Sequence, residues 1–253
     1  MQRLVLKVGS AVLTQDGKIA HRRLDNLVSF ISLLKEKYDV ILVSSGAVAA
    51  GFTRLKLDKS KLSNKQALAS IGQPLLMRMY KGEFEKYDII CSQVLLEATM
   101  FSDITRLNRA KDTINTLLSN GVVPIINEND VTAVDELVFG DNDQLAAYVA
   151  HYFNTDLLTI LTDIDGYYDK NPHIYKNAKL QKIVTNISED ELSEKHNANS
   201  EFATGGIVTK LKAADFLMKN HKDMFLTSGF NLEYAKDYLL NSEHTLGTIF
   251  KGN

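Results

Sequence analysis

Short apolar runs alternate along this chain with segments that have the spacing of amphipathic helices, and this alternation constrains the fold more than any other feature. The runs 39–44 (DVILVS) and 156–162 (DLLTILT) are typical of strands that are buried on both faces. Residues 21–37 repeat leucine, valine and isoleucine at three- and four-residue intervals, as one face of a helix does. Strands that alternate with helices form a mainly parallel sheet between helix layers. The sequence therefore predicts an α/β protein, a three-layer αβα sandwich around a mainly parallel open sheet.

The same alternation extends over nearly the whole chain. Further strands are expected at 3–8, 89–95, 122–126, 223–227 and 246–250, and further helices at 47–51, 64–87, 102–120, 142–153 and 207–220. The pair Asp16-Gly17 predicts a hairpin turn after the first strand. With only three prolines and no linker-like stretch, we expect a single domain over residues 1–253. Within it, two lobes of about 1–153 and 154–253 would share one sheet.

Composition and charge exclude several classes of function. Lysine and arginine number 29 and aspartate and glutamate 31, so no basic excess points to nucleic acid or to a membrane surface. The single cysteine, Cys91, permits no internal disulfide and no cysteine metal cluster, and the six histidines show no metal-ligand spacing. There is no signal sequence, and no apolar run approaches the roughly 20 residues of a membrane span. We expect a cytoplasmic protein without a metal site of its own and without nucleic-acid or membrane partners.

Small and polar residues gather where the predicted strands end. The segments are 7–10 (KVGS), 44–47 (SSGA), 127–130 (NEND), 140–143 (GDND), 162–163 (TD) and 203–210 (ATGGIVTK). Each alone could be only a turn or a helix cap. In open parallel sheets, however, ligands bind beyond the carboxyl ends of the strands, and six such segments at one edge indicate a binding site.

Two lysines suggest the chemistry of that site. Lys7 ends an apolar strand, where a buried charge is unfavourable unless an anion lies nearby; the alternative is an exposed lysine at a strand end. Lys210 falls in the predicted first turn of a helix, behind two glycines, and such a helix start suits a phosphate. The chain has no Walker loop, no protein-kinase motif set and no GxGxxG after its first strand. Phosphate would therefore be bound on another scaffold.

Taken together, five of these segments resemble the amino-acid kinase superfamily. They are KVGS at 7–10, SGAVAAG at 45–51, INEND at 126–130, FGDND at 139–143 and TGGIVTK at 204–210, in the order of the family. INEND followed by FGDND most resembles the branch that phosphorylates the side-chain carboxylate of L-glutamate at the start of proline biosynthesis. The resemblance implies the amino-acid kinase fold, an acceptor lobe followed by a nucleotide lobe, and ATP as donor with Mg²⁺ on its phosphates. Many bacterial members continue into a small RNA-binding-type (PUA) domain, which this chain is expected to lack.

The resemblance also assigns roles by position. Lys7 and Lys210 would stabilise charge on the transferring phosphoryl group, and Asp143 would hold both lysines. The glutamate site would comprise Ser45, Gly46, Asp130 and Asn142, with Asn127 as a neighbour. ATP would be bound by Lys7, Thr162, Asp163, Thr204, Gly205, Gly206, Ile207, Val208, Thr209 and Lys210. Because a carboxylate acceptor is already ionised at neutral pH, no general base is expected.

Two alternatives stay open at this point. A sister kinase would act on acetylglutamate, aspartate, carbamate or a nucleoside monophosphate, although the acidic and amide-rich NEND and GDND segments suit an amino group better than a second phosphate. A non-catalytic ligand sensor on the same fold would be expected to lose Lys7, Lys210 or Asp143, and all three are present. The resemblance further implies a homo-oligomer, feedback inhibition by proline felt in the segment 131–139, and hand-off of the product to γ-glutamyl phosphate reductase.

Overall fold

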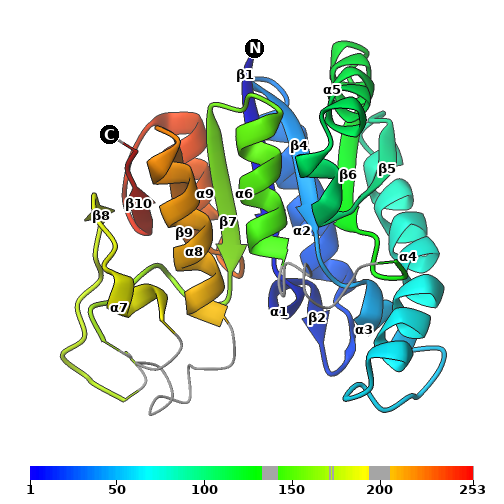
Figure 1. Ribbon diagram of the computed structural model, residues 1–253, viewed down its shortest axis with the longest axis horizontal. Coiled ribbons are helices and arrows are strands. Elements are labelled where there is room, and N and C mark those ends of the chain that lie inside the picture. The colour runs from blue at the N-terminus through cyan, green and yellow to red at the C-terminus, as the bar shows by residue number, and fades with distance from the viewer. Residues whose placement is uncertain (133–141, 171, 173, 194–205, 253) are drawn as a thin grey trace.

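The computed structural model describes residues 1–132, 142–170, 172, 174–193 and 206–252, and an eight-stranded sheet lies at its centre (Figure 1). The strand order is β5-β6-β4-β1-β7-β9-β10-β8, and every pair is parallel except β9 with β10. The bounds are β1 (Gln2–Val8), β4 (Tyr38–Ser44), β5 (Cys91–Leu96), β6 (Val123–Glu128), β7 (Leu157–Thr162), β8 (Ile183–Val184), β9 (Asp223–Ser228) and β10 (Thr248–Phe250). The predicted mainly parallel sheet is confirmed.

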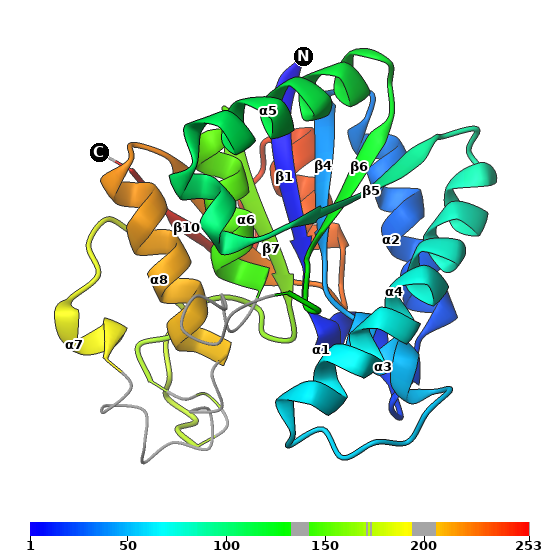
Figure 2. The ribbon, with the colours of Figure 1, turned by 45° about the vertical axis from the view of Figure 1, so that its right-hand side comes forward.

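Helices cover both faces of this sheet (Figures 1 and 2). One face packs against α5 (Ile104–Ser119), α6 (Asn142–Tyr152) and α8 (Gly206–Lys219), and the other against α2 (His21–Leu34), α4 (Leu62–Glu85) and α9 (Glu233–Lys236). Successive residues of β1 pack against opposite helix layers. Val5 lies in the core on the α5, α6 and α8 side, and Leu4 and Leu6 lie in the core on the other side. Side chains alternate across a strand, so a strand between two helix layers must be apolar at consecutive positions. The three-layer αβα sandwich is confirmed.

A short antiparallel hairpin follows the first strand, as the Asp16-Gly17 pair predicts. Strands β2 (Thr14–Gln15) and β3 (Lys18–Ile19) flank the turn, and both turn residues have positive φ, 51° for Asp16 and 71° for Gly17. Two consecutive positive φ values suit a two-residue hairpin turn.

The remaining short elements are α1 (Ser10–Leu13), α3 (Ala47–Phe52), the 3₁₀ helix η1 (Ala98–Ser102), α7 (Glu189–Leu192) and the π-helical turn η3 (Asp237–Asn241). None of the described helices is long and apolar enough to cross a bilayer.

Three strands differ by two residues from a predicted bound, and one of them, β5, begins at Cys91 instead of residue 89. Strand β6 continues two residues beyond the expected end at Ile126, and it buries the side chains of Asn127 and Glu128. A polar side chain is tolerated in a buried strand when it is hydrogen-bonded, and Asn127 donates to the side chain of Gln73. Strand β10 begins two residues late, because Gly247 has a φ of 109°, which is incompatible with a strand.

Helices α3 and α4 cross in direct backbone contact. A Cβ atom added at Gly51 would lie 1.9 Å from the carbonyl oxygen of Leu68, and one added at Gly72 would lie 1.7 Å from that of Ala47. Any side chain at these positions would force the helices apart. The two glycines therefore fix the position of α3, and with it the Ser45-Gly46 loop that precedes it.

Candidate active site

Four of the predicted polar segments, those that follow β1, β4, β6 and β7, meet at one edge of the sheet, where these strands end. Val8, the last residue of β1, is in register with Ser44 of β4 on one side and Leu161 of β7 on the other. Backbone hydrogen bonds continue the pairing into the loops, from the Gly9 amide to the Leu161 carbonyl (3.1 Å) and from the Ser45 amide to the Val8 carbonyl (3.2 Å). Because neighbouring parallel strands run the same way, residues far apart in sequence converge here.

A buried carboxylate holds two lysines together at this edge. The Nζ atom of Lys7 lies 2.5 Å from Oδ1 of Asp143, and the Nζ atom of Lys210 lies 3.0 Å from Oδ2 of the same residue. The exposed fractions of the three side chains are only 1%, 7% and 0% for Lys7, Lys210 and Asp143. Lys7 reaches Asp143 because it alternates with Leu6 along β1 and so faces the helix layer that contains α6. The anion that a buried Lys7 requires is therefore Asp143.

The start of α8 completes this arrangement. Thr209 donates a hydrogen bond from Oγ1 to Oδ2 of Asp143 (3.1 Å), and Lys210 donates from Nζ to the carbonyl of Gly206 (2.8 Å). The four-residue spacing of Gly206 and Lys210 folds the lysine back over the first turn of its own helix. Two ammonium groups and one carboxylate sum to one net positive charge, and the amino end of α8 adds its positive dipole end. Such an assembly can stabilise negative charge on a phosphate.

A second group of side chains joins the acceptor segments. The Asn142 amide nitrogen lies 2.8 Å from Oδ1 of Asn127, 3.1 Å from Oγ of Ser45 and 3.2 Å from the carbonyl of Ser44. Gly46, which follows Ser45, precedes α3 with a φ of 113°, a left-handed conformation that favours glycine. The structure thus brings Ser45, Asn127 and Asn142 into one hydrogen-bonded cluster next to Asp143.

Asp130 lies in a small recess beside this cluster. The recess has a volume of about 170 Å³, and its lining includes Asp130, Asn129, Gln73 and Gln93. Burial raises the pKa of the Asp130 carboxyl, because removal from water disfavours the charged form. A ligand ammonium group in the recess would restore a favourable environment for the ionised carboxylate.

The predicted nucleotide residues lie one strand farther along the sheet. Thr162 ends β7 and donates from Oγ1 to Oδ1 of the exposed Asp163 (3.0 Å), while its carbonyl accepts from the Gly229 amide (2.7 Å). In α8, Val208 is buried and Ile207 packs against the core, so their side chains belong to the core. Thr204 and Gly205 lie outside the described residues, as do residues 133–139 of the segment expected to respond to proline.

Sequence reasoning missed two glutamines that support the acceptor cluster. Gln73 accepts from the Asn127 amide (3.0 Å), and its own amide donates to Oε1 of Gln93 (3.3 Å). A signal was available for Gln73, which falls on the same face of α4 as the buried residues Ala69 and Leu76. An amide on the apolar face of a helix needs a buried partner. Gln93 offers no such signal, because its partner is known only from the tertiary structure.

Comparisons with known proteins agree with this geometry. The family model described as the amino acid kinase family matches residues 2–228. The chain is 53% identical over 255 residues to a glutamate 5-kinase of Wolinella succinogenes, covering 99% of this chain and 98% of that protein. It is 52% identical over 250 residues to a glutamate 5-kinase of Leishmania donovani, covering 99% and 95%. An isopentenyl phosphate kinase structure matches with a TM-score of 0.68 at 17% identity, covering 98% of this chain and 99% of that one, which is a likeness of fold.

Proposed function

Because the chain belongs to the amino acid kinase family, we propose that it is a glutamate 5-kinase, which transfers the γ-phosphate of ATP to the side-chain carboxylate of L-glutamate. The product is γ-glutamyl 5-phosphate, and the reaction is the first step of proline biosynthesis. The observation that carries the proposal is the buried Lys7–Asp143–Lys210 assembly beside the amide cluster of Asn142. It combines cations for a phosphoryl group with hydrogen-bonding groups for a polar acceptor.

The reaction needs positioning and charge rather than acid–base catalysis. The acceptor carboxylate is ionised at neutral pH, so it can attack the γ-phosphorus without losing a proton. Negative charge on the transferring group is then stabilised by preorganised cations, and we assign this role to Lys7 and Lys210. Asp143 contacts both ammonium groups and so fixes their separation. It is a positioning residue in this scheme, and the bond from Thr209 holds its carboxylate in turn.

The acceptor site follows from charge and hydrogen bonding. We assign the α-amino group of glutamate to Asp130, since an ammonium group offsets the unfavourable burial of that carboxylate. Ser45, Gly46, Asn142 and the neighbouring Asn127 would bind the remaining polar groups. The cluster presents amides and hydroxyls rather than lysine or arginine, which favours an amino-acid acceptor over a nucleoside monophosphate.

ATP would occupy the other lobe of the site. Thr162, Asp163 and the loop and helix start at 204–210 are assigned to it, with Lys7 and Lys210 at its γ-phosphate. Among the described residues, no group of three or more histidine, cysteine, aspartate or glutamate side chains could hold a metal ion. In the proposed reaction Mg²⁺ would be bound to the ATP phosphates and shield their charge. In this scheme residues 1–153 form the acceptor lobe and residues 154–253 the nucleotide lobe.

Further properties are part of the same proposal. Proline shares the α-amino and α-carboxylate groups of glutamate, so it would compete for the groups around Asp130 and Asn142. A biosynthetic enzyme that uses ATP and glutamate is expected in the cytoplasm. We also expect a homo-oligomer, and transfer of the unstable acyl phosphate to γ-glutamyl phosphate reductase.

An acceptor screen tests the proposal directly. The protein is incubated with MgATP, hydroxylamine and one acceptor at a time: L-glutamate, N-acetyl-L-glutamate, L-aspartate, carbamate or UMP. We expect rapid ADP release and a trapped hydroxamate with L-glutamate, and neither signal from the Lys210→Met variant. Faster ADP release with another acceptor would reassign the substrate, and no release with any of them would favour a non-catalytic role.

A further inference from the structure

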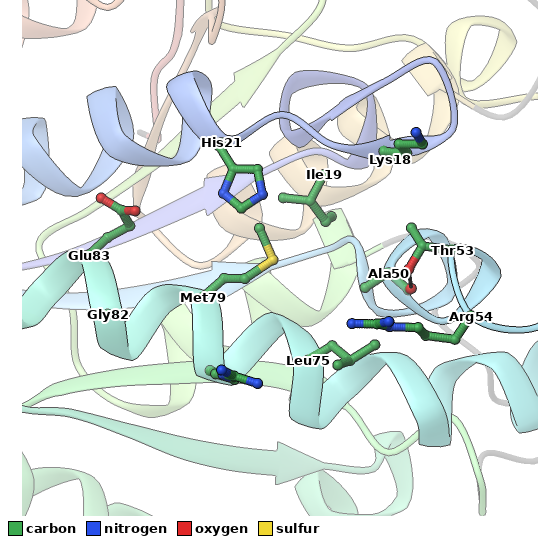
Figure 3. A pocket seen from close by; sticks show the side chains of 11 residues that line it. Lys18, Ile19, His21, Ala50, Thr53, Arg54, Leu75, Met79, Gly82 and Glu83 are labelled. Carbon is green, nitrogen blue, oxygen red and sulfur yellow. Dashed lines mark hydrogen bonds between the residues drawn. The ribbon is translucent and has the colours of Figure 1, made fainter.

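A broad groove lies apart from the residues assigned to the reaction, between the β2–β3 hairpin, the start of α2, helix α3 and helix α4 (Figure 3). Its volume is about 610 Å³, within the range of sites for small organic molecules. It is lined by Lys18, Ile19, His21, Ala50, Thr53, Arg54, Leu75, Arg78, Met79, Gly82 and Glu83. None of the residues that we assign to glutamate or ATP is among them.

Three cationic side chains from separate elements line this groove. Lys18 belongs to the hairpin, Arg54 follows α3 and Arg78 lies on α4, and all three side chains are exposed. Figure 3 shows the side chain of Arg54 extending above Leu75 toward the middle of the groove. No ion pair among the described residues involves any of the three cations.

The carboxylate that lines the groove offsets only part of this charge. Glu83 pairs with Lys86, just past the end of α4, and Lys86 also lies 3.1 Å from Asp25 of α2. Glu83, Asp25 and Lys86 together carry one net negative charge, against the three positive charges of Lys18, Arg54 and Arg78. Positive charge that gathers at a concave surface attracts anions.

The floor of the groove is apolar. Ile19, Ala50, Leu75 and Met79 supply apolar surface between the cationic side chains. Guanidinium groups bind phosphate through two parallel N–H donors, and a phosphate monoester carries nearly two negative charges at neutral pH. A phosphate attached to an organic body matches both the charge of the rim and the apolar floor.

We propose that this groove binds a small organic phosphate. Lys18, Arg54 and Arg78 hold the phosphate, and the organic part lies on Ile19, Leu75 and Met79. The site is separate from the nucleotide site, because Lys7 and Lys210 contribute nothing to its lining.

Phenyl phosphate is a suitable probe, since it combines a phosphate dianion with one apolar ring. Calorimetric titrations are carried out with a saturating non-hydrolysable ATP analogue and Mg²⁺, so that the nucleotide site is already filled. We expect saturable binding at one site, tighter than that of inorganic phosphate. Arg54→Gln and Arg78→Gln should each weaken it by about tenfold or more, as expected when one strong charge-assisted contact is lost. Arg109→Gln, which removes an exposed arginine from α5, should leave it unchanged.

A variant that changes shape rather than charge gives an independent test. A Cβ atom added at Gly82 meets no atom within 4 Å, so Gly82→Leu places an apolar side chain in the groove without a clash. This variant should weaken phenyl phosphate binding and keep the wild-type melting temperature. The proposal is overturned if the wild-type protein shows no saturable binding with its nucleotide site filled. It is equally overturned if the double variant Arg54→Gln/Arg78→Gln binds as tightly as wild type.

Discussion

Replacing Asp143 by asparagine should be among the most destabilising isosteric changes in this chain. The substitution keeps the size of the side chain but removes the carboxylate that contacts both Lys7 and Lys210. Removing one partner of a buried ion pair costs about 3–5 kcal/mol, because the remaining charge stays buried. For a domain of this size, 1 kcal/mol corresponds to about 2–4 °C, so the melting temperature should fall by about 6–20 °C.

A surface ion pair provides the matched control. Asp215 lies 2.7 Å from Lys219, a length between those of the two Asp143 contacts, but the side chain of Lys219 is 70% exposed. Exposed pairs contribute about 0–1 kcal/mol, so Asp215→Asn should lower the melting temperature by less than about 4 °C. Thermal unfolding of both variants without nucleotide, followed by circular dichroism, measures the difference. If Asp143→Asn melts no lower than Asp215→Asn, the argument from the buried assembly is wrong.

Five further outcomes are expected. Lys7→Ala and Lys210→Ala should each lower kcat by about 10²–10³, the usual loss for one donor to a developing charge; a variant that keeps more than half the kcat would exclude that lysine from the mechanism. Asp130→Asn should raise the KM for glutamate and leave the KM for ATP nearly unchanged; equal increases in both would contradict the assignment. Burial raises the pKa of Asp130 in the folded protein above its value in the unfolded chain. The protonated carboxyl therefore adds fully to the free energy of unfolding only below the unfolded-state pKa, and this addition is lost as pH rises through the folded-state pKa. Denaturation curves should accordingly show Asp130→Asn to be more stable than wild type at pH 7. Proline should raise the apparent KM for glutamate in initial-rate assays, and an unchanged rate in millimolar proline at low glutamate would refute competition. Gly72→Ala, whose Cβ would lie 1.7 Å from a carbonyl oxygen of α3, should destabilise the protein and weaken glutamate binding, whereas Gly82→Ala on the same helix should do neither.

Periodicity along the chain was enough to predict the architecture. Apolar runs and helical spacing indicated the parallel sheet and both helix layers, because strands buried on two faces must be apolar at consecutive positions. The Asp16-Gly17 turn was equally local, since two positive φ values depend on those residues alone. Short elements such as α9 and the π-helical turn after it were not predicted, because four or five residues are too few to show a helical repeat of apolar residues.

The polar segments that form the candidate site were also visible in the sequence. The family resemblance implied that Asp143 holds both lysines, but no local pattern showed that contact. Nothing local to Lys7 indicates that its anion is Asp143, 136 positions further on, or that the same carboxylate also holds Lys210. That contact exists because β1 is central in the sheet and α6 packs over the face to which Lys7 points.

The sequence by itself determined which residue types were available for phosphate chemistry and the order of the elements that carry them. Apart from the contacts of Asp143 with Lys7 and Lys210, which the family resemblance implied, only the tertiary structure decided which of these residues meet. The chain of amides from Asn142 through Asn127 and Gln73 to Gln93 links α6, β6, α4 and β5. The cationic groove likewise needs a hairpin and two helices, α3 and α4, to come together. Pairings of this kind depend on how strands are ordered and helices crossed, which is a property of packing rather than of any local pattern.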